Sequence, residues 1–283
     1  MVFDDDINVE GASEALYFER TYGKFYGVRF VAVQLPFNEV TAGKDGVLYG
    51  GQVQTDWQFD SNNRADLNAG YFSWNHADQV LFALGAPVTQ VNGGISNGAA
   101  VTGAQNGALG TTNRLIRDAN GNPIGFLANF NILDVLANYV WQPRDKTRVR
   151  FNFDYVHNLS RRINDENNGY SVGLGFHHTR CDWSKGRWMQ GTDPCDELRY
   201  QHDWLIGYTF ARIEQDAVLV PFNFSDILAS NSRVQIPTLA YVPTDRVVLQ
   251  WTGLFSQRAN KIFLLSPVNR WINRMQFDVI YKF

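Results

Sequence analysis

The sequence predicts an all-β fold, specifically a transmembrane antiparallel β-barrel, from three observations. Apolar and polar residues alternate with a period of two along many segments. These segments are about ten to thirteen residues long, the length that crosses a bilayer at a tilt. Short turns alternate with long loops between them, the asymmetry that is typical of bacterial outer-membrane barrels.

The alternation is clearest in the segment KTRVRFNFDYVHN, residues 146–158. One face carries Val149, Phe151, Phe153 and Tyr155, and the other carries Arg148, Arg150, Asn152 and Asp154. The same reasoning predicts about eleven strands, near residues 14–22, 24–35, 47–59, 63–75, 131–142, 146–158, 169–180, 198–212, 232–243, 245–257 and 271–283. A soluble β-sandwich also alternates, but long strands with charges in their middle favour the barrel.

The composition excludes several other classes of protein. No stretch approaches the roughly 18 uninterrupted apolar residues of a membrane-spanning helix. A net charge of −3 is too small to indicate binding to nucleic acid. The opening MVFDDDINVE is acidic and does not resemble a signal peptide, so we expect either a cytoplasmic protein or a sequence without its true beginning.

We expect one barrel domain over residues 1–283, with two unusual connections. Segment 76–130 is a long loop rich in Gly, Asn, Ala and Thr that lies either outside the cell or folded into the lumen as a constriction. Segment 181–195 begins and ends with cysteine. Cys181 and Cys195 are predicted to form a disulfide that closes a periplasmic loop, worth about 3 kcal/mol in the chain-entropy model, although in a reducing compartment they would stay free thiols.

Several segments resemble one family when they are taken in order. They are FDDDINVEG, ALYFER, GVLYGGQVQTDW, NFNILDVLANYVW, DYVHNL and HDWLIGYTFARIEQDAVLVPFNFSD. The chain resembles the C-terminal two-thirds of the "putative porin" family of Gram-negative outer-membrane proteins. The resemblance implies passive diffusion of small hydrophilic solutes or ions. No Ser or Cys nucleophile has a partnered spacing that stands out, so we expect neither an enzymatic activity nor a cofactor. It also implies a barrel of about sixteen strands, and an even strand number predicts that about five strands and the signal peptide precede Met1.

The ending MQFDVIYKF resembles the signal that the barrel-assembly machinery reads on a final strand. Its alternate residues are Met275, Phe277, Val279, Tyr281 and Phe283. The resemblance further implies the bacterial outer membrane as location, with membrane lipid and lipopolysaccharide as neighbours. A homotrimer and a complex with a partner chain both remain open, and a barrel that serves as a sleeve or anchor for such a partner is the alternative function.

Charged residues on the polar face of the strands are the candidate lining of the lumen. They are Asp56, Arg64, Asp66, Asp134, Arg148, Arg150, Asp154, Arg199, Asp203 and Asp278. Because their signs are mixed, they either create a transverse field across the pore or pair with one another and stiffen the wall. Adjacent His177 and His178 point to opposite faces of a strand, so neither a metal site nor a catalytic dyad is predicted. An aromatic girdle is expected at the periplasmic rim from Trp57, Phe59, Trp141, Tyr241, Tyr281 and Phe283.

Overall fold

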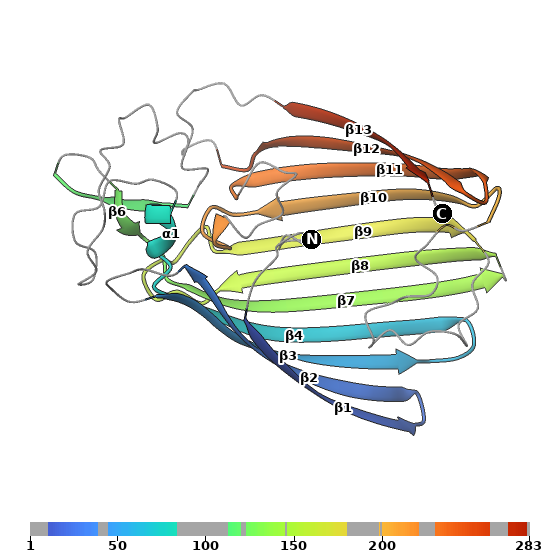
Figure 1. The fold of residues 1–283 in the computed structure, drawn as a ribbon, viewed down its shortest axis with the longest axis horizontal. Helices are drawn as coiled ribbons and strands as arrows, with labels where there is room; N and C mark the ends of the chain where they lie inside the picture. Colours follow the sequence, from blue (N-terminus) through green and yellow to red (C-terminus); the bar gives the residue numbers. More distant parts are fainter. Residues whose placement is uncertain are drawn as a thin grey trace.

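The structure, a computed structural model, describes residues 11–38, 45–83, 113–119, 123–144, 146–179, 198, 200–220, 230–260 and 271–281. An 11-stranded antiparallel sheet forms most of this part of the chain, and each strand pairs with the next one in sequence (Figure 1). Its strands are β1 (Ala12–Tyr22), β2 (Phe25–Asn38), β3 (Gly46–Gln58), β4 (Asn63–Asn75), β7 (Phe130–Arg144), β8 (Thr147–Asn158), β9 (Asn168–His178), β10 (Trp204–Ile213), β11 (Ser232–Thr244), β12 (Val247–Arg258) and β13 (Ile272–Tyr281).

Three further elements lie between β4 and β7. Helix α1 (Gln79–Ala83) follows β4, and strands β5 (Leu115–Arg117) and β6 (Pro123–Phe126) pair into a small second sheet. None of the three was predicted from the sequence, because each is shorter than the segments in which periodicity can be recognised. Across the described residues, the structure contains no helix with the length and hydropathy needed to span a membrane.

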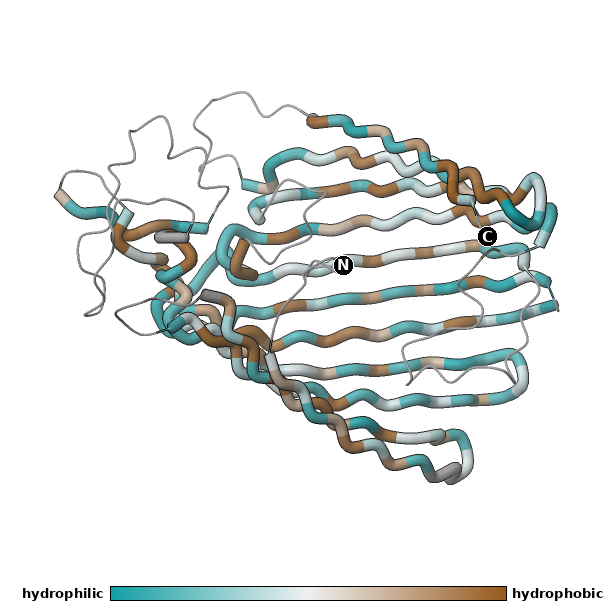
Figure 2. The backbone as a smooth tube through the Cα atoms, viewed as in Figure 1, coloured by the Kyte–Doolittle hydropathy of each residue, from teal (hydrophilic) through white to brown (hydrophobic). Residues whose placement is uncertain are grey.

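Hydrophilic and hydrophobic residues alternate along the strands (Figure 2), and the two faces of the sheet differ chemically, as the alternation predicted. On β8, Phe151 is 41% exposed on the outer face, whereas Arg148 is 1% exposed on the inner face. Neighbouring strands repeat the pattern in register, since Phe151 lies opposite Tyr139 on β7 and Leu174 on β9. The outer face is therefore apolar and open, and the inner face carries most of the polar side chains.

The two ends of the sheet differ in the length of their connections. Short turns join β1 to β2, β3 to β4, β7 to β8 and β11 to β12 at one end. In the turn after β3, the Asp60 carboxylate accepts hydrogen bonds from the Asn62 amide (2.7 Å) and the Asn63 side chain (2.8 Å). These hydrogen bonds lower the pKa of Asp60. The connections at the opposite end are long, which confirms the predicted asymmetry.

The predicted strand 198–212 was wrong at its start, because β10 begins only at Trp204. Asp203 instead fixes a turn. Its Oδ2 atom accepts hydrogen bonds from the Thr179 hydroxyl (2.7 Å) and the Tyr200 amide (3.0 Å). His202, just before β10, has a φ of 71°. This left-handed conformation is incompatible with an extended strand, so β10 cannot begin earlier.

Strands β1 and β13 form the two open edges of the sheet, and the described strands do not close into a ring (Figure 1). Each strand of the sheet runs opposite to its neighbour. The first strand, β1, and the eleventh, β13, therefore run in the same direction. Direct pairing of the edges would be parallel. An antiparallel closure requires an odd number of further strands between them.

The turn between β1 and β2 depends on Gly23, which has a φ of 60°. Glycine at the first central position of a two-residue turn suits a type II′ hairpin. We expect Gly23→Ala to destabilise the protein by about 1 kcal/mol, because a side chain is disfavoured at positive φ. The urea midpoint of unfolding measures the effect, and Gly23→Asn, which tolerates this conformation better, should lose less. Equal midpoints for all three proteins would contradict the assignment.

Candidate functional site

Four aspartates form an acidic group on the inner face of β3, β4, β7 and β8. Asp56 and Asp66 are directly opposite each other across β3 and β4. Asp134 on β7 and Asp154 on β8 lie on the same face, one step apart diagonally. The register thus brings together four of the predicted lumen residues, which are separated by up to almost a hundred positions in the sequence.

The predicted arginines lie on the same face, nearer to the short turns. Arg64 lies near the start of β4, and Arg148 and Arg150 lie near the start of β8. Arg150 interacts electrostatically with Asp66 and donates a hydrogen bond from Nε to Asn152 (3.0 Å). Arg64 likewise interacts with Asp56. Part of the wall therefore consists of opposite charges held close together.

Arg148 is 1% exposed, and its Nη2 atom lies 3.2 Å from Nδ1 of His177 on β9. Since a guanidinium can only donate, Nδ1 of His177 is the acceptor in this contact. His178 points to the other face and stacks on Trp204, with ring centroids 5.7 Å apart. The prediction that the two histidines face opposite ways is confirmed. No cluster of three metal-ligating side chains occurs in the described segments.

The remaining predicted lumen residues are more scattered. Asp278 lies on the inner face of edge strand β13, where Gln276 donates to it at 3.1 Å. Asp203 is in the turn before β10 rather than in a strand. Arg199 lies outside the described residues, as do Cys181, Cys195 and Phe283.

The inner face of β9, β10 and β11 has a different chemistry, which the sequence reasoning missed. Its described residues carry no carboxylate, lysine or arginine, and many are small. They include Gly169, Ser171, Gly173, Gly175, Gly207, Thr209 and Ala211. Alternate glycines in NGYSVGLGF were the available clue. Farther along this wall, Ala211, Val234, Ile236 and Leu254 form a small apolar cluster.

A family model described as "Putative porin" matches residues 1–230. The chain belongs to the putative porin family. The comparison with curated proteins gave no match. The match agrees with the family that the sequence motifs indicated, and at a coarse level it supports a porin-like outer-membrane channel.

At the long-loop end of this porin-family chain, several connections pack together as a cap, which we define as α1, the β5–β6 pair and residues 159–167 and 213–220. Leu81, Phe126 and Leu219 of the cap share one hydrophobic core with Ile132 and Val156 on the inner face of β7 and β8. The described parts of segment 76–130 thus contact the inner face at the end of the sheet (Figure 1).

A polar network fastens the cap. The Asn113 side chain donates to the carbonyls of Gln215 and Val218, both at 2.8 Å, and accepts from the Val220 amide at 3.0 Å. Next to it, Arg114 donates through its backbone amide (2.9 Å) and Nε to the carboxylate of Asp216. These contacts join segments about a hundred residues apart in the chain.

Asp216 is the centre of this network and is fully buried. Burial raises the pKa of Asp216, and the hydrogen bonds from Arg114 offset only part of this effect. Burial also raises the pKa of Asp78, whose Oδ1 accepts from the Phe126 amide at 2.6 Å. Burial alone would lower the pKa of Arg114, but its bonds to Asp216 and Asp165 raise it.

Arg114 has two carboxylate partners that differ in exposure, which allows a matched test. Asp216→Asn should weaken the cap by about 3 kcal/mol, because it leaves the partly buried guanidinium of Arg114 without its buried anion and with only the exposed Asp165. Asp165→Asn should cost less than about 1 kcal/mol, since the Asp165 side chain is 70% exposed. Hydrogen exchange of the Arg114 amide measures both effects. Equal acceleration in the two variants would show that Asp216 does not hold the cap.

Proposed function

We propose that the chain forms an outer-membrane channel through which small hydrophilic solutes and ions diffuse. The observation that carries the proposal is the two-faced sheet, whose outer side is apolar over its middle and whose inner side carries carboxylates, guanidinium groups and amides. In lipid, only a closed barrel satisfies every backbone group of a sheet. A polar inner face then surrounds water.

Two rows of aromatic side chains on the outer face support insertion in a bilayer. The row near the short turns contains exposed Phe59, Trp141, Tyr241 and Tyr281. These are members of the girdle predicted from the sequence. A second row near the long loops contains Tyr71 and Tyr155, whose hydroxyls donate to Asn131 and Asn168. Such rows flank the apolar band of outer-membrane barrels, where the ring is buried and the polar tip remains hydrated.

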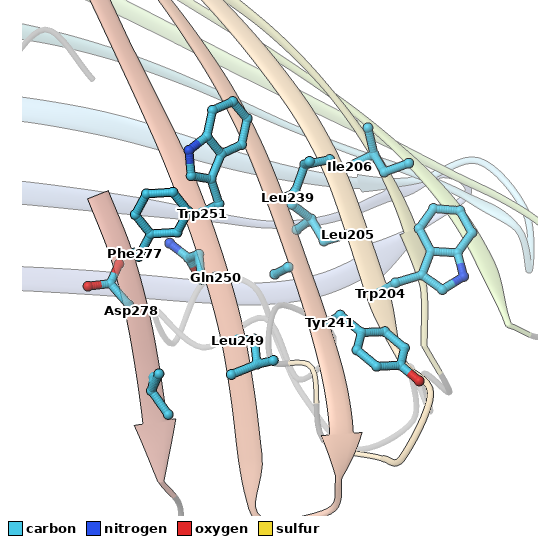
Figure 3. A pocket seen from close by; sticks show the side chains of 12 residues that line it. Trp204, Leu205, Ile206, Leu239, Tyr241, Leu249, Gln250, Trp251, Phe277 and Asp278 are labelled. Atoms are coloured by element: carbon cyan, nitrogen blue, oxygen red, sulfur yellow. The ribbon is translucent and has the colours of Figure 1, made fainter. Parts of the chain in front are cut away.

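Aliphatic residues fill the outer face between the rows, including Leu67, Leu174 and Leu239. A shallow apolar depression of 430 Å³ lies against β10 to β13, lined by Ile206, Leu239, Trp251 and Phe277 among others (Figure 3). On β13, Phe277 is 75% exposed and Val279 is 73% exposed. This apolar edge supports the proposal that the barrel-assembly machinery recognises the last strand.

The alternative, a barrel that holds a partner chain as a sleeve, is favoured by the apolar cluster of Val234, Ile236 and Leu254 on the inner face. A water-filled pore does not need such a cluster, whereas a polypeptide inside the barrel could pack on it.

Purified protein reconstituted into planar bilayers distinguishes the two functions. The channel predicts steady conductance that rises in proportion to salt concentration. A folded barrel that remains silent and purifies with a stoichiometric partner chain would overturn the channel proposal and support the sleeve.

Neighbouring positions on β4 test the assignment of the two faces. We expect Leu67→Arg to destabilise the protein in lipid vesicles by about 2–4 kcal/mol, because it places a charge in the apolar band. Asn68→Arg should cost much less, since Asn68 faces inward and its amide already contacts Asp66 (3.4 Å). Urea unfolding in vesicles measures both variants. Equal losses would contradict the assignment of an outer, lipid-facing side.

A further inference from the structure

Two arginines lie directly opposite each other on the outer face of the sheet, Arg212 on β10 and Arg233 on β11. They belong to the outward-facing residues of their strands, which include Ile206 on β10 and Leu239 on β11. Arg233 is exposed, and the Arg212 side chain is 35% exposed. Opposite residues have Cβ atoms about 5 Å apart, and like charges in such positions destabilise a sheet. The pair is therefore unfavourable unless an anion lies close to both side chains.

The described residues provide an anion for one of the two arginines. Arg212 donates from Nη2 to Oε1 of Glu214 at 3.2 Å. The other oxygen of this carboxylate, Oε2, accepts from the Asn168 amide at 2.9 Å. Within the ranges that the structure describes, Arg233 forms no hydrogen bond and no ion pair. One carboxylate thus serves two guanidinium groups, and the outer face keeps a positive charge at this place.

The arginines lie at the level of the aromatic row near the long loops. Tyr155 of that row is opposite Tyr170, and Tyr170 is opposite Arg212. The hydroxyl of Tyr155 donates to Asn168 at 2.8 Å, whereas that of Tyr170 has no acceptor among the described residues. In an outer-membrane barrel, such a row marks the boundary between the apolar band and the headgroups, and the long loops are extracellular. On the proposed function, the arginines therefore lie at the headgroup level of the outer leaflet.

We propose that Arg212 and Arg233 bind a phosphate group of lipopolysaccharide, the phosphorylated glycolipid of the outer leaflet. The inference rests on the proposed function, because it requires the outer face to lie in the outer membrane. A phosphate monoester carries about 1.5 to 2 negative charges at neutral pH and offers three acceptor oxygens. A guanidinium group binds phosphate through two parallel hydrogen bonds. One phosphate between the arginines removes their repulsion, and the Tyr170 hydroxyl adds a donor. The acyl chains of the same lipid then lie along apolar residues such as Ile206 and Leu239.

The test measures the binding of defined lipids to the full chain in detergent micelles by native mass spectrometry. The wild type should bind the bisphosphorylated lipid anchor of lipopolysaccharide more tightly than it binds phosphatidylglycerol. Arg233→Gln should weaken binding of the lipid anchor by about tenfold, because it removes a charge-assisted interaction worth at least 1.4 kcal/mol or so. Arg246→Gln removes the same charge from the exposed turn between β11 and β12, and it should leave the affinity unchanged.

A second probe leaves the protein unaltered and keeps the test valid if Arg233→Gln fails to fold. The lipid anchor without its phosphates should bind the wild type about as weakly as the intact anchor binds the variant. Removal of the phosphates should then have little effect on binding to Arg233→Gln, because the two changes remove the same interaction.

The outcomes separate this inference from the function on which it rests. Equal affinity of the intact anchor for the wild type and folded Arg233→Gln would overturn the glycolipid site. Equal weakening by Arg246→Gln, or equally tight binding of phosphatidylglycerol or of the anchor without phosphates, would overturn it as well. A wild-type chain that conducts in planar bilayers but fails these binding tests keeps the channel function and loses the site. A folded chain that neither conducts nor binds the lipid anchor would overturn both proposals.

Discussion

The continuous antiparallel hydrogen-bond ladder is the constraint on which the rest of the structure depends. Side chains alternate between the faces of each strand, so a shift of one residue in register would exchange the two faces. The pairing runs from Gly27 opposite Asp56, through Asp56 opposite Asp66, to Asp66 opposite Asn138. Once one residue of such a row faces inward, all of them do. The charged wall therefore follows from the register as a whole and not from any single contact.

Irregularities in the ladder are confined to the ends of strands. Register shifts close to short turns occur between Glu19 and Tyr22, between Trp141 and Arg144, and between Tyr241 and Thr244. A further shift, between Pro36 and Asn38, lies at the other end of β2. Bulges at such places adjust the twist of a hairpin without changing which face a mid-strand residue occupies.

The two ends of the sheet also differ in how they are stabilised. Short turns use hydrogen bonds between near neighbours, such as Asp60 with Asn62, whereas the cap uses contacts between distant segments, such as Asn113 with Val218.

The range of each interaction explains how much the sequence could reveal. Alternation is local, so Val149 to Tyr155 could be assigned to the outer face from the sequence alone, and the eleven strands of the sheet were found close to their observed positions. The start of β10 was missed because it depends on the contact between Thr179 and Asp203. The second aromatic row was missed because the partners of Tyr71 and Tyr155 lie on other strands. The cap could not be predicted either, because it depends on which distant segments the fold brings together. For the inner face of β9, β10 and β11, which lacks charged side chains, the alternate glycines in NGYSVGLGF were the one local clue.

The distribution of small residues gives the proposed channel an asymmetric wall. On β9, a Cβ atom at Gly173 would lie 3.1 Å from the hydroxyl oxygen of Thr209, and one at Gly175 would lie 3.0 Å from Nε2 of His177. Glycine therefore leaves this part of the inner face without bulky side chains, whereas β3, β4, β7 and β8 carry the long charged side chains. A solute inside the proposed channel would face charged side chains on β3, β4, β7 and β8, and small side chains on β9 and β10. The asymmetry thus places most of the inner-face carboxylates of the proposed channel on β3, β4, β7 and β8.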